Sequence, residues 1–280
     1  MIIDFHTHTF PDRIAAAALQ KLQADSHAQA FSDGTKGGLL SSMASAGIDR
    51  SVVLPVATNP KKVCSINDLS IAAFGTDDLI YFGCIHPEND DSTQELSRIA
   101  AAGIKGIKIH PIYQGTDIHD LRFLRILGKA AELGLIVVMH AGDDIAFPGI
   151  VRCSPKMIRT AVDQVGPIHL VLAHMGGWKN WSRVVDCLSD TGVYLDTSFS
   201  LGHIIPLEAG HYTPAQQQLL TAAEFCEIVR SFGADRILFG TDSPWACQKS
   251  AVDDIRQLPL SDAEKAAILS GNACRLLQLA

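Results

Sequence analysis

Residues 120–142 read DLRFLRILGKAAELGLIVVMHAG, and this stretch contains the unit from which the chain is built. From Asp120 to Leu133 the apolar residues recur three and four positions apart, as in an amphipathic helix. Gly134 follows at a point where helices commonly end. A β-branched run from Leu135 to Met139 then ends at His140, so the stretch predicts a helix, a turn and a buried strand.

The same order of helix and strand recurs along the chain. Short apolar runs alternate with longer stretches of helical spacing such as Ala215 to Phe232, and the runs lie at residues 2–5, 51–55, 79–85, 104–109, 135–139, 168–173, 193–195 and 236–239. Repeated strand–helix units predict a parallel sheet, and eight of them favour a closed barrel, with a doubly wound open sheet as the alternative. The predicted fold class is α/β, a single (β/α)8 TIM-type barrel domain over residues 1–280.

The composition of the chain indicates which kinds of partner and cellular compartment suit it. The chain has 280 residues, of which 47% are hydrophobic and 19% charged, and its formal net charge is −7. An acidic chain favours a small-molecule substrate over nucleic acid or an anionic membrane as its partner. Seven dispersed cysteines without a CxxC pair, and no leading basic and apolar segment, predict a cytoplasmic protein with reduced thiols. The sequence is also compatible with a homo-oligomer.

Polar residues stand at the ends of five of the predicted strands. They are His6 and His8, then Lys108 and His110, His140, His174, and Asp242. In a β/α barrel the carboxyl ends of the strands form the catalytic face. Strand residues alternate sides, so His6 and His8 face the same way. Three imidazoles and a carboxylate suit Zn²⁺ with one position left for water, and the metal would lower the pKa of that water.

Five motifs together resemble one known family. They are residues 4–8 (DFHTH), 106–111 (GIKIHP), 139–142 (MHAG), 173–177 (AHMGG) and 239–244 (FGTDSP). In this order they are similar to the amidohydrolase superfamily, in the amidohydrolase-related branch that includes aminocarboxymuconate semialdehyde decarboxylase. The resemblance implies His6, His8, His140 and Asp242 as ligands of one divalent metal ion. That ion is expected to be Zn²⁺, with Mn²⁺, Fe²⁺ and Ni²⁺ as alternatives.

The resemblance also implies roles beyond metal binding. His174 is expected to be catalytic beside the metal, and Asp242 to accept a proton as well as bind the ion. Lys108 lies near the bridging lysine of binuclear members, but its Lys-x-His-Pro setting is more similar to the mononuclear branch. We expect His110 to contact substrate, and also Arg152, which follows the predicted strand 135–139. Lys156 and Arg159, farther along the same stretch, also suit the solvated face of a helix.

These residues predict metal-dependent hydrolysis of an amide, ester or lactone bond in a small molecule by a metal-activated water. Non-oxidative decarboxylation of a small carboxylic acid is the alternative, because the same ligands serve it. A TatD-like metal nuclease is a further alternative, but the glutamate that is typical of that group at the predicted strand 104–109 is absent. A non-catalytic binding or scaffold barrel is the remaining alternative, but such a protein is expected to have lost some of the ligand residues, and all of them are present.

Overall fold

The computed structural model describes residues 1–75 and 78–279. The chain divides into two compact units, each of which is formed by segments distant in sequence. Unit 1 comprises residues 1–52, 145–148 and 196–280, and unit 2 comprises residues 53–144 and 149–195. The expectation of one domain over the whole length stays a prediction.

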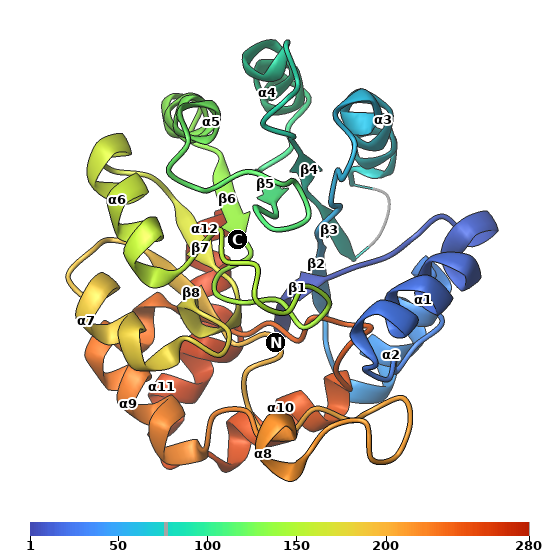
Figure 1. The fold of residues 1–280 in the computed structure, drawn as a ribbon, viewed down its shortest axis with the longest axis vertical. Coiled ribbons are helices and arrows are strands. Elements are labelled where there is room, and N and C mark those ends of the chain that lie inside the picture. Colours follow the sequence, from blue (N-terminus) through green and yellow to red (C-terminus); the bar gives the residue numbers. More distant parts are fainter. Residues whose placement is uncertain (76–77, 280) are drawn as a thin grey trace. The chain divides into compact units, whose positions relative to one another are not determined.

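Unit 2 contains short strands, most of which are followed in the chain by a helix. Its strands are β3 (Leu79–Tyr81), β4 (Gly83–Cys84), β5 (Gly106–Ile109), β6 (Ile136–Met139), β7 (Leu170–Leu172) and the start of β8 (Tyr194–Asp196). Its helices are α3 (Val63–Ala73), α4 (Ser92–Ala101), α5 (Leu121–Glu132), α6 (Pro155–Val165) and α7 (Val184–Leu188). Neighbouring strands from β4 to β8 pair in parallel. Figure 1 shows α3 to α6 along the outer side of these strands.

Helix α5 shows why the quoted stretch folds as predicted. The side chain of Asp120 accepts a hydrogen bond from the backbone N–H of Arg122 and so caps the helix. Phe123 and Leu127, one turn apart, are buried against the strands. The strand that follows, β6, is buried at every position, as its β-branched composition predicts. Helix and strand are both confirmed.

Unit 1 brings the two ends of the chain together. Its strands are β1 (Ile3–Thr7), most of β2 (Arg50–Val53), the end of β8 and β9 (Ile237–Leu238). Its helices are α1 (Asp12–Ser26), α2 (Lys36–Ala46), α8 (Pro214–Gln217), α9 (Ala222–Phe232), α10 (Gln248–Gln257), α11 (Asp262–Ala266) and α12 (Asn272–Leu277). The N–H of Phe5 donates to the carbonyl of Phe239 at 2.7 Å. The N–H of Asp242 donates to the carbonyl of His6 at 2.8 Å, so these segments lie side by side.

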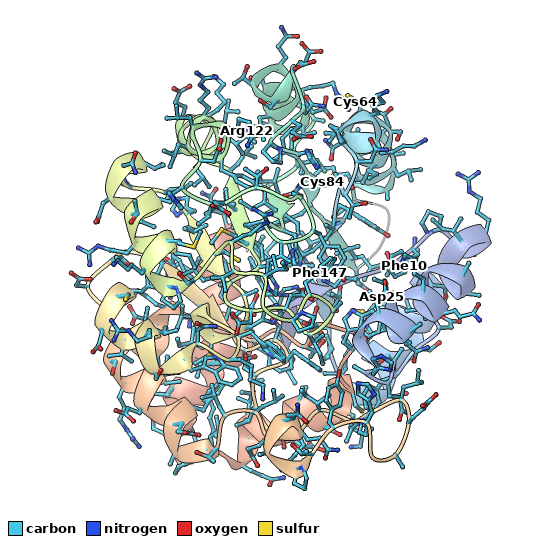
Figure 2. The ribbon with its side chains drawn as sticks, viewed as in Figure 1. Phe10, Asp25, Cys64, Cys84, Arg122 and Phe147 are labelled. Atoms are coloured by element: carbon cyan, nitrogen blue, oxygen red, sulfur yellow. The ribbon has the colours of Figure 1, made fainter. Side chains whose placement is uncertain are left out.

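Two predicted elements are divided in the structure. The stretch 215–232 forms α8 and α9 instead of one helix, because Thr221 starts a second helix through a capping box with Glu224. The run 79–85 forms two strands, β3 and β4. The two strands have different neighbours: the N–H of Phe82, which lies between them, donates to the carbonyl of Val53 at the end of β2, whereas β4 pairs with β5. Figure 2 marks Cys84, which is buried, and Cys64, which is exposed on α3.

Candidate metal centre

The predicted site residues divide between the two units. His6, His8 and Asp242 belong to unit 1, whereas His110, His140, Arg152 and His174 belong to unit 2. Within each unit the histidines form a cluster. The unit 1 cluster is His6, His8 and Asp242, and the unit 2 cluster is His110, His140, His174 and Asp144.

In the unit 1 cluster three ligand atoms lie close together. The Nε2 atoms of His6 and His8 are 3.2 Å apart. Oδ1 of Asp242 lies 3.4 Å from the first and 3.2 Å from the second. Strand alternation explains the pairing, because His6 and His8 are two positions apart at the end of β1. The structure therefore gathers three of the four predicted ligands, all on unit 1.

The other nitrogen of His6 is fixed by a buried carboxylate. Nδ1 of His6 lies 2.8 Å from Oδ2 of Asp196, and both side chains are fully buried. Because an ionised carboxylate only accepts, Nδ1 carries the hydrogen and the lone pair remains on Nε2. The hydroxyl of Ser198 donates to the other oxygen of Asp196 and so holds that carboxylate. A metal-binding histidine commonly has such a carboxylate partner, which fixes its orientation.

Asp196 and Ser198 were missed by the sequence analysis. Asp196 directly follows the apolar run 193–195, so it obeys the same strand-end pattern that identified the histidines. Only three residues marked that run as a strand, which made its end a weak signal. Asp196 is the last residue of β8.

A second buried carboxylate, Asp4, supports the segment that carries Asp242. Oδ1 of Asp4 accepts the N–H of Thr241 at 2.9 Å, and Oδ2 accepts the Thr241 hydroxyl and the Gln248 amide at 2.6 and 2.7 Å. Burial raises the pKa of Asp4 to about 7, against the lowering effect of these hydrogen bonds. The contacts join β1 to the backbone immediately before Asp242.

Both residues expected to be catalytic have left-handed backbone conformations. The φ angle is 67° at Asp242 and 59° at His174. Such angles are uncommon for residues other than glycine and cluster at functional sites. Each is held by a hydrogen bond to its backbone: Asp242 donates to His6, and the carbonyl of His174 accepts from the Trp181 indole at 2.9 Å.

The unit 1 cluster fits a divalent metal ion. An imidazole nitrogen with a fixed lone pair and a carboxylate oxygen are donors that Zn²⁺ and Mn²⁺ accept. With metal–ligand distances of about 2.0–2.1 Å, neighbouring ligands of a tetrahedral ion lie roughly 3.3–3.4 Å apart. The measured separations of 3.2–3.4 Å match this spacing.

In unit 2 the tautomer of His140 follows from its contacts. Its Nε2 atom lies 3.0 Å from the carbonyl oxygen of Asp143, which can only accept a hydrogen bond, so Nε2 carries the hydrogen. The lone pair is therefore on Nδ1, which lies 3.1 Å from Nε2 of His174. Burial first, and then the nearby His110 and His174, keep the pKa of His140 well below its usual value. His140 is thus a neutral imidazole at neutral pH.

His110 stacks on His140. The ring centroids are 4.0 Å apart and the planes differ by 13°. Oδ2 of Asp144 lies 3.4 Å from Nε2 of His110 and 3.9 Å from Nε2 of His140. In parallel stacked rings the in-plane lone pairs do not converge, and Nε2 of His140 carries a hydrogen. The trio His110, His140 and Asp144 therefore does not fit one shared ion.

Arg152 pairs with an acidic side chain in its own unit. Its Nη1 atom donates to Oδ1 of Asp117 at 3.0 Å, and both side chains are partly exposed. Its carbonyl accepts from the N–H of Ile118 at 2.9 Å, so the loop after β6 is joined to the loop after β5. The expected contact of Arg152 with substrate stays a prediction.

Comparison with known proteins identifies the family. The family model described as amidohydrolase matches residues 3–279. The chain belongs to the amidohydrolase family. This amidohydrolase has no match among curated proteins. No helix among the described residues is long and apolar enough to cross a membrane.

Solved structures similar to this amidohydrolase share its fold at low sequence identity. An uncharacterized TIM-barrel protein from Bordetella bronchiseptica is 20% identical, with a TM-score of 0.76 over 99% of this chain and 98% of that one. A 5-carboxyvanillate decarboxylase from Novosphingobium aromaticivorans, complexed with manganese and 4-hydroxy-3-methoxy-5-nitrobenzoic acid, is 15% identical (TM-score 0.74, coverage 100% and 96%). A putative 2-pyrone-4,6-dicarboxylic acid hydrolase from Pseudomonas putida is 20% identical (0.65, 99% and 97%). The predicted fold class, an α/β TIM-type barrel, is confirmed.

Proposed function

We propose that this amidohydrolase binds one divalent metal ion through His6, His8 and Asp242, with His140 as the fourth ligand. The observation that carries the proposal is the unit 1 cluster, in which three ligand atoms lie within 3.4 Å of one another. The assignment of His140 rests on its place at the end of β6 and on the lone pair at Nδ1. Zn²⁺ and Mn²⁺ both suit these donors, and manganese is present in the similar decarboxylase.

We propose non-oxidative decarboxylation of a small carboxylic acid as the reaction, in preference to the hydrolysis favoured by the sequence. The similar structures support this choice, because 5-carboxyvanillate and 2,6-dihydroxybenzoate decarboxylases occur among them. The carbon–carboxylate bond breaks with its electron pair on carbon, CO2 leaves, and one proton is added to the same carbon. The reaction needs neither oxidant nor reductant.

The chain's own residues supply the proton and the orientation. Asp242 presents Oδ1 to the two histidines of β1, and we assign proton transfer to its other oxygen, Oδ2. Bound metal would supply a positive charge that polarises substrate oxygen atoms and favours their ionised form. Asp196 keeps the His6 lone pair on Nε2, and His174 Nε2, facing Nδ1 of His140, is assigned to stabilise developing negative charge.

Hydrolysis is the second candidate, supported by the putative hydrolase among the similar structures. There Asp242 would accept a proton from water instead of donating one to carbon. The similar hydrolase and the similar decarboxylases are all named after carboxylic acids, so one panel of such acids can separate the two candidates.

The deciding experiment incubates metal-replete protein with hydroxylated benzoic acids and with pyrone dicarboxylic acids. Released CO2 and ring-opened acid are measured in parallel, with Asp242→Asn as the control. We expect CO2 release from a hydroxylated benzoic acid, and a rate lower on the order of 10²-fold or more in the variant. Ring opening without CO2 release would favour hydrolysis. Cleavage of nucleic acid by the same preparation, absent in the variant, would instead support the nuclease alternative.

A further inference from the structure

The unit 2 cluster contains two residues for which metal binding provides no role, His110 and Asp144. We infer that they position the imidazole of His140 and are not themselves ligands. The inference rests on the proposed function, since it concerns how one proposed ligand is held. It reassigns His110 from substrate contact to support of a neighbouring side chain.

His110 is held on several sides. Its Nδ1 atom accepts the backbone N–H of Tyr113 at 3.4 Å, so in the neutral ring the hydrogen is on Nε2. That hydrogen faces Oδ2 of Asp144, 3.4 Å away. The Tyr113 ring meets His110 edge to face with centroids 4.5 Å apart. Both nitrogens of the imidazole are thus directed at protein atoms, which favours a fixed ring over one that contacts substrate.

The fixed ring of His110 forms a platform for His140. The stacking at 4.0 Å covers one face of the His140 ring, and both side chains are buried. The register of the strands explains this contact, because Ile109 of β5 lies beside Met139 of β6 and the two histidines follow directly. With one face covered and Nε2 directed at the Asp143 carbonyl, rotation of the His140 ring is restricted. Nδ1 is therefore the nitrogen presented to a ligand.

Asp144 lies away from Nδ1 of His140, the nitrogen presented to a ligand. Its carboxylate lies on the Nε2 side of both rings, opposite Nδ1 of His140. It follows Asp143, whose carbonyl accepts from His140, so one short segment sets the hydrogen position in both imidazoles. Asp144 is a positioning residue in this arrangement.

The test compares variants that keep or remove the platform. His110→Phe retains an aromatic face, His110→Ala removes it, and Asp144→Asn retains an acceptor oxygen that Asp144→Ala removes. His119→Ala, an exposed histidine in the same loop, is the matched control. Two readouts are independent of turnover: the His140 tautomer in metal-free protein by long-range ¹H–¹⁵N NMR, and Zn²⁺ affinity by chelator competition.

We expect both alanine variants to lose the uniform Nε2–H tautomer of His140 and to bind Zn²⁺ about 10–100-fold more weakly, the usual cost of losing such support. His110→Phe, Asp144→Asn and the His119 control should stay near wild type. An unchanged tautomer and affinity in His110→Ala, with KM raised in both His110 variants, would overturn the inference in favour of substrate contact. If wild-type protein binds no metal, the proposed function fails, while the tautomer comparison still decides the positioning role.

Discussion

The two histidine clusters contain similar residues in different arrangements. In unit 1 the two imidazoles are nearly perpendicular, at 74°, and their Nε2 atoms approach each other beside a carboxylate oxygen. In unit 2 His110 and His140 are nearly parallel, and a carboxylate lies beside their Nε2 edge. Two histidines and an aspartate can therefore form a metal site or a support. The direction of the lone pairs decides which, and the residue count does not.

The surroundings of the clusters reinforce this difference. Asp196 accepts a hydrogen bond from Nδ1 of His6, so the lone pair on Nε2 is directed at the cluster. In unit 2 the carbonyl of Asp143 accepts a hydrogen bond from Nε2 of His140, so the lone pair of that ring is on Nδ1. The hydrogen-bond partner on the far nitrogen thus selects the ligand atom in each case.

The largest effect should come from removing a ligand of the unit 1 cluster. We expect His6→Ala to lose bound metal and activity together, because only His8 and Asp242 of the cluster remain. Elemental analysis of protein purified without chelator measures the metal, and CO2 release measures the activity. Full metal content in His6→Ala would show that the ion is held elsewhere and would break the contrast between the clusters.

Asp242→Asn should separate metal binding from chemistry. The amide keeps the shape and one oxygen, so we expect substantial metal to remain. The amide cannot carry the proton, so turnover should fall on the order of 10²-fold or more, as when a general acid or base is lost. Near-native turnover of a metal-replete Asp242→Asn protein would contradict the assigned role. His174→Ala is the companion variant, with metal kept and rate lost.

Asp196 supports His6 in unit 1 as His110 and Asp144 support His140 in unit 2, so the same measurement can be made on both. We expect Asp196→Asn to weaken metal affinity about 10–100-fold, because a neutral amide no longer holds the Nδ1 hydrogen of His6 as firmly. Ser198→Ala should have a smaller effect in the same direction, since it removes the hydroxyl beside Asp196 and His6 but leaves the carboxylate of Asp196 beside Nδ1 of His6. Chelator competition measures both. Equal affinity in Asp196→Asn and wild type would mean that the His6 tautomer does not depend on this carboxylate.

Sequence patterns predicted the strands and also the three proposed ligands that the structure gathers in unit 1. Alternation with period two was enough to pair His6 with His8, and an apolar run was enough to place Asp242 near a strand end. Asp144 lies in a loop, where no periodicity marks its direction. Stacking of His110 on His140 depends on the register between β5 and β6, which neither segment encodes alone. The tautomers depend on partners distant in sequence, such as Asp196 for His6.

A third polar cluster, in unit 2, differs from both histidine clusters: Asn67 and Glu95 are buried, whereas Arg98 is exposed. Glu95 on α4 accepts two hydrogen bonds from Arg98, at 2.8 Å each, and one from the amide of Asn67. Asn67 in turn bonds the backbone of Cys84. These donors and acceptors pair with one another, so we expect a purely structural role.

The smallest effect is therefore expected for Glu95→Gln, and it should appear in stability alone. The Arg98 hydrogen bonds, and then that from Asn67, lower the pKa of Glu95 in the folded protein. A lowered pKa means that the ionised side chain stabilises the fold above the unfolded pKa, and that this contribution is lost as the pH falls through the folded pKa. We expect Glu95→Gln to lower the free energy of unfolding by about 1–2 kcal/mol at pH 7, and by progressively less in acid. Urea unfolding across this pH range measures the difference, with Glu132→Gln, an exposed partner of Lys129, as the control. Metal affinity should be unchanged. A loss of stability that did not shrink in acid would show that packing, not the charge, is what Glu95 contributes.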